Sequence, residues 1–263
     1  MVVFLHQLTA ATYLAACLAA GVGLALGSGR ATRIAVLLLG AGALVHAVAL
    51  GGLHTARPTP PLTDTSAAVS FMAWIGTLAY LALLRRSRVS GLAVLVAPMA
   101  FLGVFYAALR LPSAGPATTA GSGSVPHAHV LLASAGLALL GLAGLAGALF
   151  LAEHRRLKRH RPLSRSPLPS LEALDRAGAL ALAIGFPLLT LGVLTGAMWV
   201  YAAHGAALTG SPHEIGALLA WCVYAVLAVQ RFGVHRSAHR CAVSALLGFA
   251  VLSAVALGVE LLA

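Results

Sequence analysis

The sequence predicts an all-α fold: a polytopic integral membrane helical bundle of about eight transmembrane helices, with both termini external. Three observations lead to this prediction. Of the 263 residues, 60% are hydrophobic and only 9% are charged, and the mean hydropathy is +0.95, whereas soluble domains carry about 25% charged residues. The apolar residues form runs of about 20, the length that crosses a bilayer. The basic residues fall almost entirely on one side of these runs.

The first half of the chain contains four predicted spans, residues 2–26, 34–53, 67–84 and 92–109. The first is interpreted as a span because no basic residue precedes its apolar stretch, as one normally does in a cleavable signal peptide. The second ends at a proline-rich stretch, residues 54–61, which no helix crosses. The third ends at an arginine-rich turn, residues 85–88.

The second half contains four more predicted spans, residues 129–151, 177–201, 215–229 and 242–262. A loop rich in Gly, Ser, Thr, Ala and Pro, residues 110–126, precedes the fifth span. The glycines of that span predict a face on which helix backbones approach closely in lipid: Gly136, Gly141, Gly144 and Gly147. Pro187 is expected to kink the sixth span. Residues 1–263 are expected to form a single transmembrane domain.

The basic residues predict the orientation of these spans. When loops are assigned alternately to the two sides, 15 of the 17 Lys and Arg residues fall on one side, and only Arg57 and Arg110 fall on the other. Because cytoplasmic loops carry the excess of Lys and Arg, the rich side is predicted to be cytoplasmic. The net charge of +11 is therefore interpreted as a topology signal, and no nucleic-acid partner is expected.

Few sequence motifs point to catalysis. Cys17, Cys222 and Cys241 are far apart and form no CxxC or CxxCH motif, so neither a redox pair nor covalent haem attachment is indicated. The chain has no HExxH, Walker-type or GxSxG motif, and no span contains a pair of acids. No catalytic residue is predicted, and no enzymatic activity of the chain alone is expected.

Histidine is the unusual residue type, with 11 copies in a chain poor in polar side chains. Imidazole is a common ligand of haem iron, and several histidines lie near the predicted external ends of spans. We therefore interpret His129, His204 and His213 as candidate haem ligands, with His129 and His204 as candidate iron ligands. His46 lies about 10 Å below the outer end of the second span, where a ligand and an internally bonded packing residue are equally expected. The histidines of the basic loops are interpreted as solvated.

Residues 195–249 contain Ser-Pro-His-Glu at 211–214, Trp-Cys-Val-Tyr at 221–224 and Gly-Phe at 248–249. With these segments in this order, the stretch resembles the C-terminal core of the CcsA/CcmC cytochrome c assembly proteins. Residues 211–214, Ser-Pro-His-Glu, stand where that family has Asp-Pro-Lys-Glu. Residues 221–224, Trp-Cys-Val-Tyr, are similar to a Trp-Leu-Val-Tyr helix segment, and residues 248–249, Gly-Phe, to the last helix. His129 occupies the place of an external haem-ligating histidine. His46 and the length of the chain resemble the short eight-helix HemX/YpjD-like members. The loop 201–214 differs from the family pattern, because it lacks the tryptophans and the motif aspartate.

The resemblance implies a helical protein of the bacterial inner membrane that binds haem on its outer side and presents or moves it to a partner in cytochrome c assembly. The expected partners are haem, an assembly subunit or apocytochrome, and the lipid bilayer. The alternative is a non-catalytic membrane regulator or scaffold, linked to tetrapyrrole metabolism or complex assembly, that acts through its basic cytoplasmic loop, residues 155–165. A small-solute transporter is less favoured, because no inverted repeat is evident.

Overall fold

A computed structural model describes residues 2–55, 65–110, 124–159, 168–234 and 236–262. Within these ranges the chain is helical and has no strand. Eight of the described helices are long and apolar enough to cross a membrane. The predicted all-α fold with about eight transmembrane helices is confirmed.

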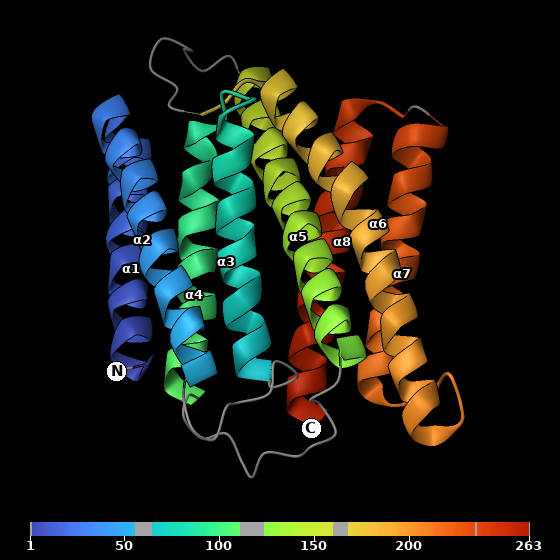
Figure 1. The fold of residues 1–263 in the computed structure, drawn as a ribbon. Helices are drawn as coiled ribbons and strands as arrows, with labels where there is room; N and C mark the ends of the chain where they lie inside the picture. The colour runs from blue at the N-terminus through green and yellow to red at the C-terminus, as the bar shows by residue number, and fades with distance from the viewer. Residues whose placement is uncertain (1, 56–64, 111–123, 160–167, 235, 263) are drawn as a thin grey trace. The chain divides into compact units, whose positions relative to one another are not determined.

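The helices follow one another in the order shown by the colours in Figure 1. Their bounds are α1 (Val2–Leu26), α2 (Gly29–Thr55), α3 (Thr65–Leu84), a 3-10 turn η1 (Ser90–Leu92), α4 (Ala93–Arg110), α5 (Ser124–Lys158), α6 (Leu171–His204), α7 (Pro212–Ala228), a π-helical turn η3 (Val229–Gly233) and α8 (Ala238–Leu262).

Helices α5 and α6 are longer than the spans predicted from hydropathy. They contain 35 and 34 residues, which at 1.5 Å per residue makes each about 50 Å long. Since the hydrocarbon core of a bilayer is about 30 Å thick, both helices are longer than the core. Helix α6 begins early because the hydroxyl of Ser170 accepts a hydrogen bond from the backbone N–H of Ala173 at 3.2 Å, a helix N-cap.

The chain divides into two compact units. The first consists of Met1–Gly121 and Ala152–Leu174 and contains α1 to α4. In it, α1 packs against α2 and α4, and α3 packs against α4 and α2 (Figure 1). The indole N–H of Trp74 donates to the carbonyl of Ala43 at 2.9 Å, and Gly42 lies directly under the ring of Tyr13. These contacts hold α1, α2 and α3 together around the buried Tyr13.

The second unit consists of Ser122–Leu151 and Asp175–Ala263. Its core cluster contains buried residues from α5, α6, α7 and α8: Leu140, Leu182, Leu189, Tyr224, Leu227 and Ala245. Helix α7 is joined to α6 by the indole N–H of Trp221, which donates to the hydroxyl of Thr190 at 3.0 Å. The core therefore takes side chains from every helix of the unit.

The glycines of α5 form the packing face that the sequence predicts. A Cβ on Gly136 would lie 2.6 Å from the backbone nitrogen of Leu189 in α6. A Cβ on Gly147 would lie 2.8 Å from the carbonyl oxygen of Ala242 in α8, and one on Gly144 would overlap the Cβ of Phe249. Because these neighbours are backbone or rigid atoms, glycine is required at each position.

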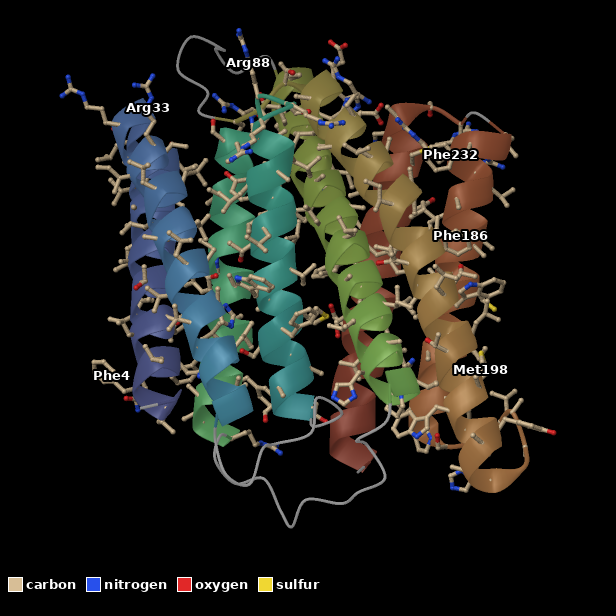
Figure 2. All side chains as sticks on the ribbon, viewed as in Figure 1. Phe4, Arg33, Arg88, Phe186, Met198 and Phe232 are labelled. Carbon is tan, nitrogen blue, oxygen red and sulfur yellow. The ribbon has the colours of Figure 1, made fainter. Side chains whose placement is uncertain are left out.

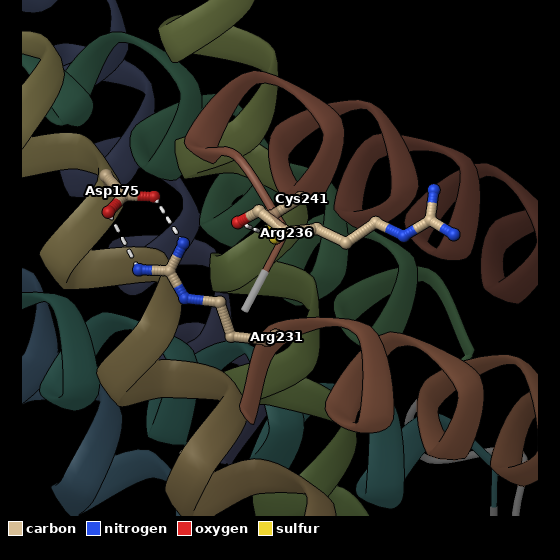
Figure 3. A network of polar contacts seen from close by, with 4 residues as sticks. All are labelled: Asp175, Arg231, Arg236 and Cys241. Atoms are coloured by element: carbon tan, nitrogen blue, oxygen red, sulfur yellow. Dashed lines mark hydrogen bonds and ion pairs between the residues drawn. The ribbon is translucent and has the colours of Figure 1, made fainter. Parts of the chain in front are cut away.

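Charged side chains gather at one end of each unit. In the first unit, Arg33 and Arg88 lie at one end and Phe4 lies at the other (Figure 2). In the second unit, Phe232 lies at one end and Met198 toward the other (Figure 2). At the Phe232 end, Arg231 donates two hydrogen bonds to the carboxylate of Asp175, at 2.6 and 2.7 Å (Figure 3). This two-bond ion pair fastens η3, the turn that follows α7, to the first turns of α6.

Some sequence-based expectations lie outside the described residues. They concern the proline-rich loop at 56–64, the loop at 111–123 and the second half of the basic run at 160–167.

Candidate functional site

His129 lies six residues into α5 and is held by α6. Its ring Nδ1 is 2.7 Å from the carbonyl oxygen of Gly192. Since a carbonyl only accepts, Nδ1 carries a proton, so Nε2 is the ring nitrogen that can offer a lone pair. The hydroxyl of Thr195 lies 2.8 Å from the carbonyl oxygen of Leu191 and 3.0 Å from that of Gly192, and its one proton is shared between them. The carbonyl of Gly192 thus fixes both the tautomer and the orientation of the imidazole.

Two glycines of α6 make room for this contact. A Cβ on Gly192 would lie 2.8 Å from the backbone nitrogen of Ala133, so only glycine lets α5 approach here. A Cβ on Gly196 would lie 2.8 Å from both Cε1 and Nδ1 of His129. The imidazole therefore lies directly against the α6 backbone, with the ring of Trp199 tilted toward it at a centroid distance of 6.2 Å.

His213, in the first turn of α7, and His204 are both exposed. An electrostatic interaction links His213 to His129, and among the described residues no hydrogen bond or ring contact joins the two side chains. His204, the last residue of α6, is exposed, and its ring is 3.3 Å from the carbonyl of Val200 in its own helix. We call His129, Gly192, Gly196, Trp199 and His213 the His129 cluster.

His46 belongs to the first unit and sits in a separate hydrogen-bonded chain. Its Nε2 is 2.9 Å from the hydroxyl of Ser70, which in turn is 3.4 Å from Nε2 of His6. Its Nδ1 is 3.4 Å from the hydroxyl of Tyr13. All four side chains are fully buried, and the rings of His6 and His46 meet edge to face at 6.1 Å. We call these four residues the His46 chain.

Each link of the His46 chain joins a donor to an acceptor when both imidazoles are neutral. If the hydroxyl of Tyr13 donates to Nδ1 of His46, then Nε2–H of His46 donates to Ser70, whose hydroxyl donates to His6. The opposite direction satisfies the same three contacts. The chain therefore buries two histidines at membrane depth without an unpaired group along these contacts.

The described residues contain no group of three or more His, Cys, Asp or Glu side chains placed to hold a metal ion. Haem iron needs only one or two protein ligands, because the macrocycle supplies the other four.

Residues 62–263 match the family described as "Cytochrome C assembly protein". The chain belongs to this family. His129, His204 and His213 lie within the matched residues, and His6 and His46 precede them. Membership gives the protein a role in cytochrome c assembly and, with eight apolar helices, identifies it as an integral membrane protein.

Several relatives are proteins named cytochrome c biogenesis protein CcsA. The chain is 31% identical over 233 residues to the one from Prochlorococcus marinus (strain MIT 9303), covering 77% of this chain and 73% of the relative. It is 29% identical over 209 residues to the one from Chlamydomonas reinhardtii, covering 77% of this chain and 58% of the relative. The resemblance to cytochrome c assembly proteins, first based on residues 211–249 and the histidines, is confirmed.

Among solved structures, the chain is similar to a protein named cytochrome c heme lyase CcmF. The TM-score is 0.69 at 17% identity, over 96% of this chain and 46% of the other. The likeness shows a shared fold, and this chain spans less than half of that protein.

Sequence reasoning identified the histidines but missed the groups that orient them. Gly192 and Gly196 form a small-xxx-small pair, a spacing that marks close helix contacts in lipid and that was available in the sequence. No such signal links His6 and Ser70 to His46, because the three residues come from different helices and a local pattern contains no information on contacts between them.

Proposed function

We propose that this protein handles haem in cytochrome c assembly, binding it near the outer face through His129 and presenting or moving it to a partner. The observation that carries the proposal is the 2.7 Å contact between Nδ1 of His129 and the carbonyl of Gly192. A backbone carbonyl on one ring nitrogen is the usual arrangement for a histidine whose other nitrogen ligates a metal, because it fixes the ring and raises ligand basicity.

The residues of the His129 cluster fit haem by their chemistry. Nε2 of His129 has no hydrogen-bond partner among the described residues, so its lone pair is available to iron. Trp199 supplies an aromatic wall beside the ring. His204 and His213, both exposed at the two ends of the α6–α7 connection, are proposed as alternates for the second imidazole that would hold the iron, and His213 is considered first because it interacts electrostatically with His129. Bound haem would supply only its iron and porphyrin as cargo, and the protein would supply ligation and orientation.

His46 is proposed as a deeper ligand or a relay, and its contacts favour the relay. Both of its ring nitrogens already face hydroxyls, of Tyr13 and Ser70. Ligation of iron by His46 would require displacing one of them, whereas proton transfer along the chain uses them as they lie. Ionisable residues such as histidine inside a membrane protein often belong to proton relays.

The proposed topology follows from the charges. The end of the first unit that carries Arg33 and Arg88, and the end of the second that carries Arg231 and Phe232, are placed in the cytoplasm. Both termini and the His129 cluster are then external, in the inner membrane of a bacterium. We further propose that the two units act as one cytochrome c assembly domain together with a partner subunit or apocytochrome.

The test is a haem titration of the purified protein in detergent, followed by its Soret absorbance. We expect a Soret band in the wild type and its loss in His129→Ala. His154→Ala is the matched control, because it removes an imidazole from the same helix at the basic end. Absence of the band in the wild type after haem supplementation, or equal bands in the two variants, would overturn the proposal.

A further inference from the structure

The loop between α6 and α7 is fastened by one carboxylate. Oε2 of Glu214 accepts the backbone N–H groups of Thr209 at 2.7 Å and Gly210 at 2.9 Å, and Oε1 accepts the hydroxyl of Thr209 at 2.7 Å. Both carboxylate oxygens of Glu214 therefore accept hydrogen bonds from the two residues just before the N-cap of α7. Three donors on one carboxylate make charge-assisted bonds, which are shorter and stronger than neutral ones.

The local sequence explains this geometry. Ser211 caps α7, because its hydroxyl accepts the backbone N–H of Glu214 at 3.3 Å, and Pro212 occupies the first helical turn. Gly210 has a φ of +79°, which turns the chain so that its N–H points back toward the helix. In a capping box the acid reaches the N–H of the cap residue, whereas here it reaches the two residues before the cap.

We propose that Glu214 is the positioning residue of the haem site, holding the α6–α7 loop against the first turn of α7, which carries His213. The inference rests on the proposed function. His213 lies in that first turn, between Pro212 and Glu214. Loss of the Glu214 carboxylate would free the loop and the first turn that carries His213, whereas the part of α7 beyond it, which is joined to α6 by the bond from Trp221 to Thr190, would stay helical.

Two substitutions distinguish a role of the Glu214 hydrogen bonds from a role of its negative charge. Glu214→Ala removes all three contacts. Glu214→Gln can keep all three, because the amide oxygen accepts the two N–H groups and the amide NH₂ donates to the hydroxyl of Thr209, which also accepts. Glu172→Ala is the matched control, since Glu172 lies in the first turn of α6 as Glu214 does in that of α7.

The first experiment measures the geometry without haem. His129→Cys and His213→Cys are introduced into a chain whose Cys17, Cys222 and Cys241 are changed to serine, and a short bismaleimide links the new pair. We expect efficient linkage with Glu214 or Glu214→Gln and at least about fivefold less with Glu214→Ala, the factor that matches one lost hydrogen bond of ordinary net strength. Equal linkage in all backgrounds, or none with Glu214 present, would overturn the inference.

The second experiment uses haem and the histidines intact. We expect a six-coordinate low-spin spectrum in the wild type, in Glu214→Gln and in Glu172→Ala. We expect a five-coordinate high-spin spectrum with haem retained in Glu214→Ala, because His129 remains. A low-spin spectrum in Glu214→Ala would overturn the positioning role. If the wild type bound no haem, the proposed function would fail, and the linkage yields would still decide whether Glu214 places His213.

Discussion

Replacing Gly196 with alanine tests the arrangement of His129 without altering any group that the haem site would use. The new Cβ would lie 2.8 Å from both Cε1 and Nδ1 of His129, whereas the best separation of non-bonded carbon atoms is about 3.5–4.0 Å. Both atoms belong to one rigid ring, so the ring has to move as a unit. That movement breaks the 2.7 Å contact between Nδ1 and the Gly192 carbonyl.

Two quantities change in Gly196→Ala. For the stability of the fold, overpacking costs about 1–3 kcal/mol and the lost hydrogen bond about 1 kcal/mol, while alanine in place of glycine in a helix returns up to about 1 kcal/mol. For haem affinity, the loss of a partner that orients a metal-ligating histidine costs about 10–100-fold. We therefore expect haem to bind Gly196→Ala about 10–100-fold more weakly than the wild type.

The assay is a haem titration followed at the Soret maximum. Gly178→Ala is the control, because it lies in the same helix and its Cβ would be 3.8 Å from Ala143 and Ala146, an ordinary contact. Its dissociation constant should equal that of the wild type. If Gly196→Ala also bound haem with the wild-type constant while His129→Ala did not bind, the carbonyl contact would have no part in ligation, and the reasoning would be refuted.

Three further predictions concern stability, each measured as the thermal midpoint of the purified protein in detergent. Gly144→Ala should lower the midpoint strongly, because its Cβ would overlap the Cβ of Phe249. Gly141→Ala should leave the midpoint unchanged, because its Cβ would lie 3.6 Å from the ring of Phe249, an ordinary contact. Equal midpoints for the two variants would contradict the packing of α5 against α8. Ser70→Ala should cost about 1–3 kcal/mol, because Nε2 of His46 would lose its hydroxyl partner inside the helix bundle. Ser253→Ala, whose hydroxyl donates to the carbonyl of Phe249 in its own helix, should cost less, and the reverse order would contradict the His46 chain. Asp175→Asn should lower the midpoint more than Arg231→Lys, because lysine keeps the positive charge and one hydrogen bond. An unchanged midpoint in both variants would show that the Arg231–Asp175 ion pair does not stabilise the protein.

The sequence predicts the helices well because lipid imposes a simple rule. A span must be apolar and about 20 residues long, so each run of low polarity marks a helix, and glycine spacing in α5 predicts its packing face. Hydropathy marks the edge of the apolar region and not the end of the helix. Glu172 and Asp175 are therefore helical in α6 although they precede its apolar stretch, and α5 continues through Arg155 and Arg156.

The candidate site is less accessible to sequence reasoning. The position of His129 at the start of a span and its resemblance to a family histidine identify it. Its hydrogen bond to Gly192, 63 residues away, depends on the rotation of two helices about their axes, which composition does not determine. The same holds for His6. The sequence places it near the end of a span, and its contacts with Ser70 in α3 and His46 in α2 become visible only in the structure.

The glycine face of α5 also constrains how the chain matures during synthesis. Gly136 receives α6, whereas Gly144 and Gly147 receive Phe249 and Ala242 of the last helix. Helix α5 is synthesised before α8, so the part of its face around Gly144 and Gly147 lacks its packing partner until α8 has entered the bilayer. A chain that stopped before α8 would leave these two glycines without the helix that packs on them, and the docking of α8 therefore completes this face of α5.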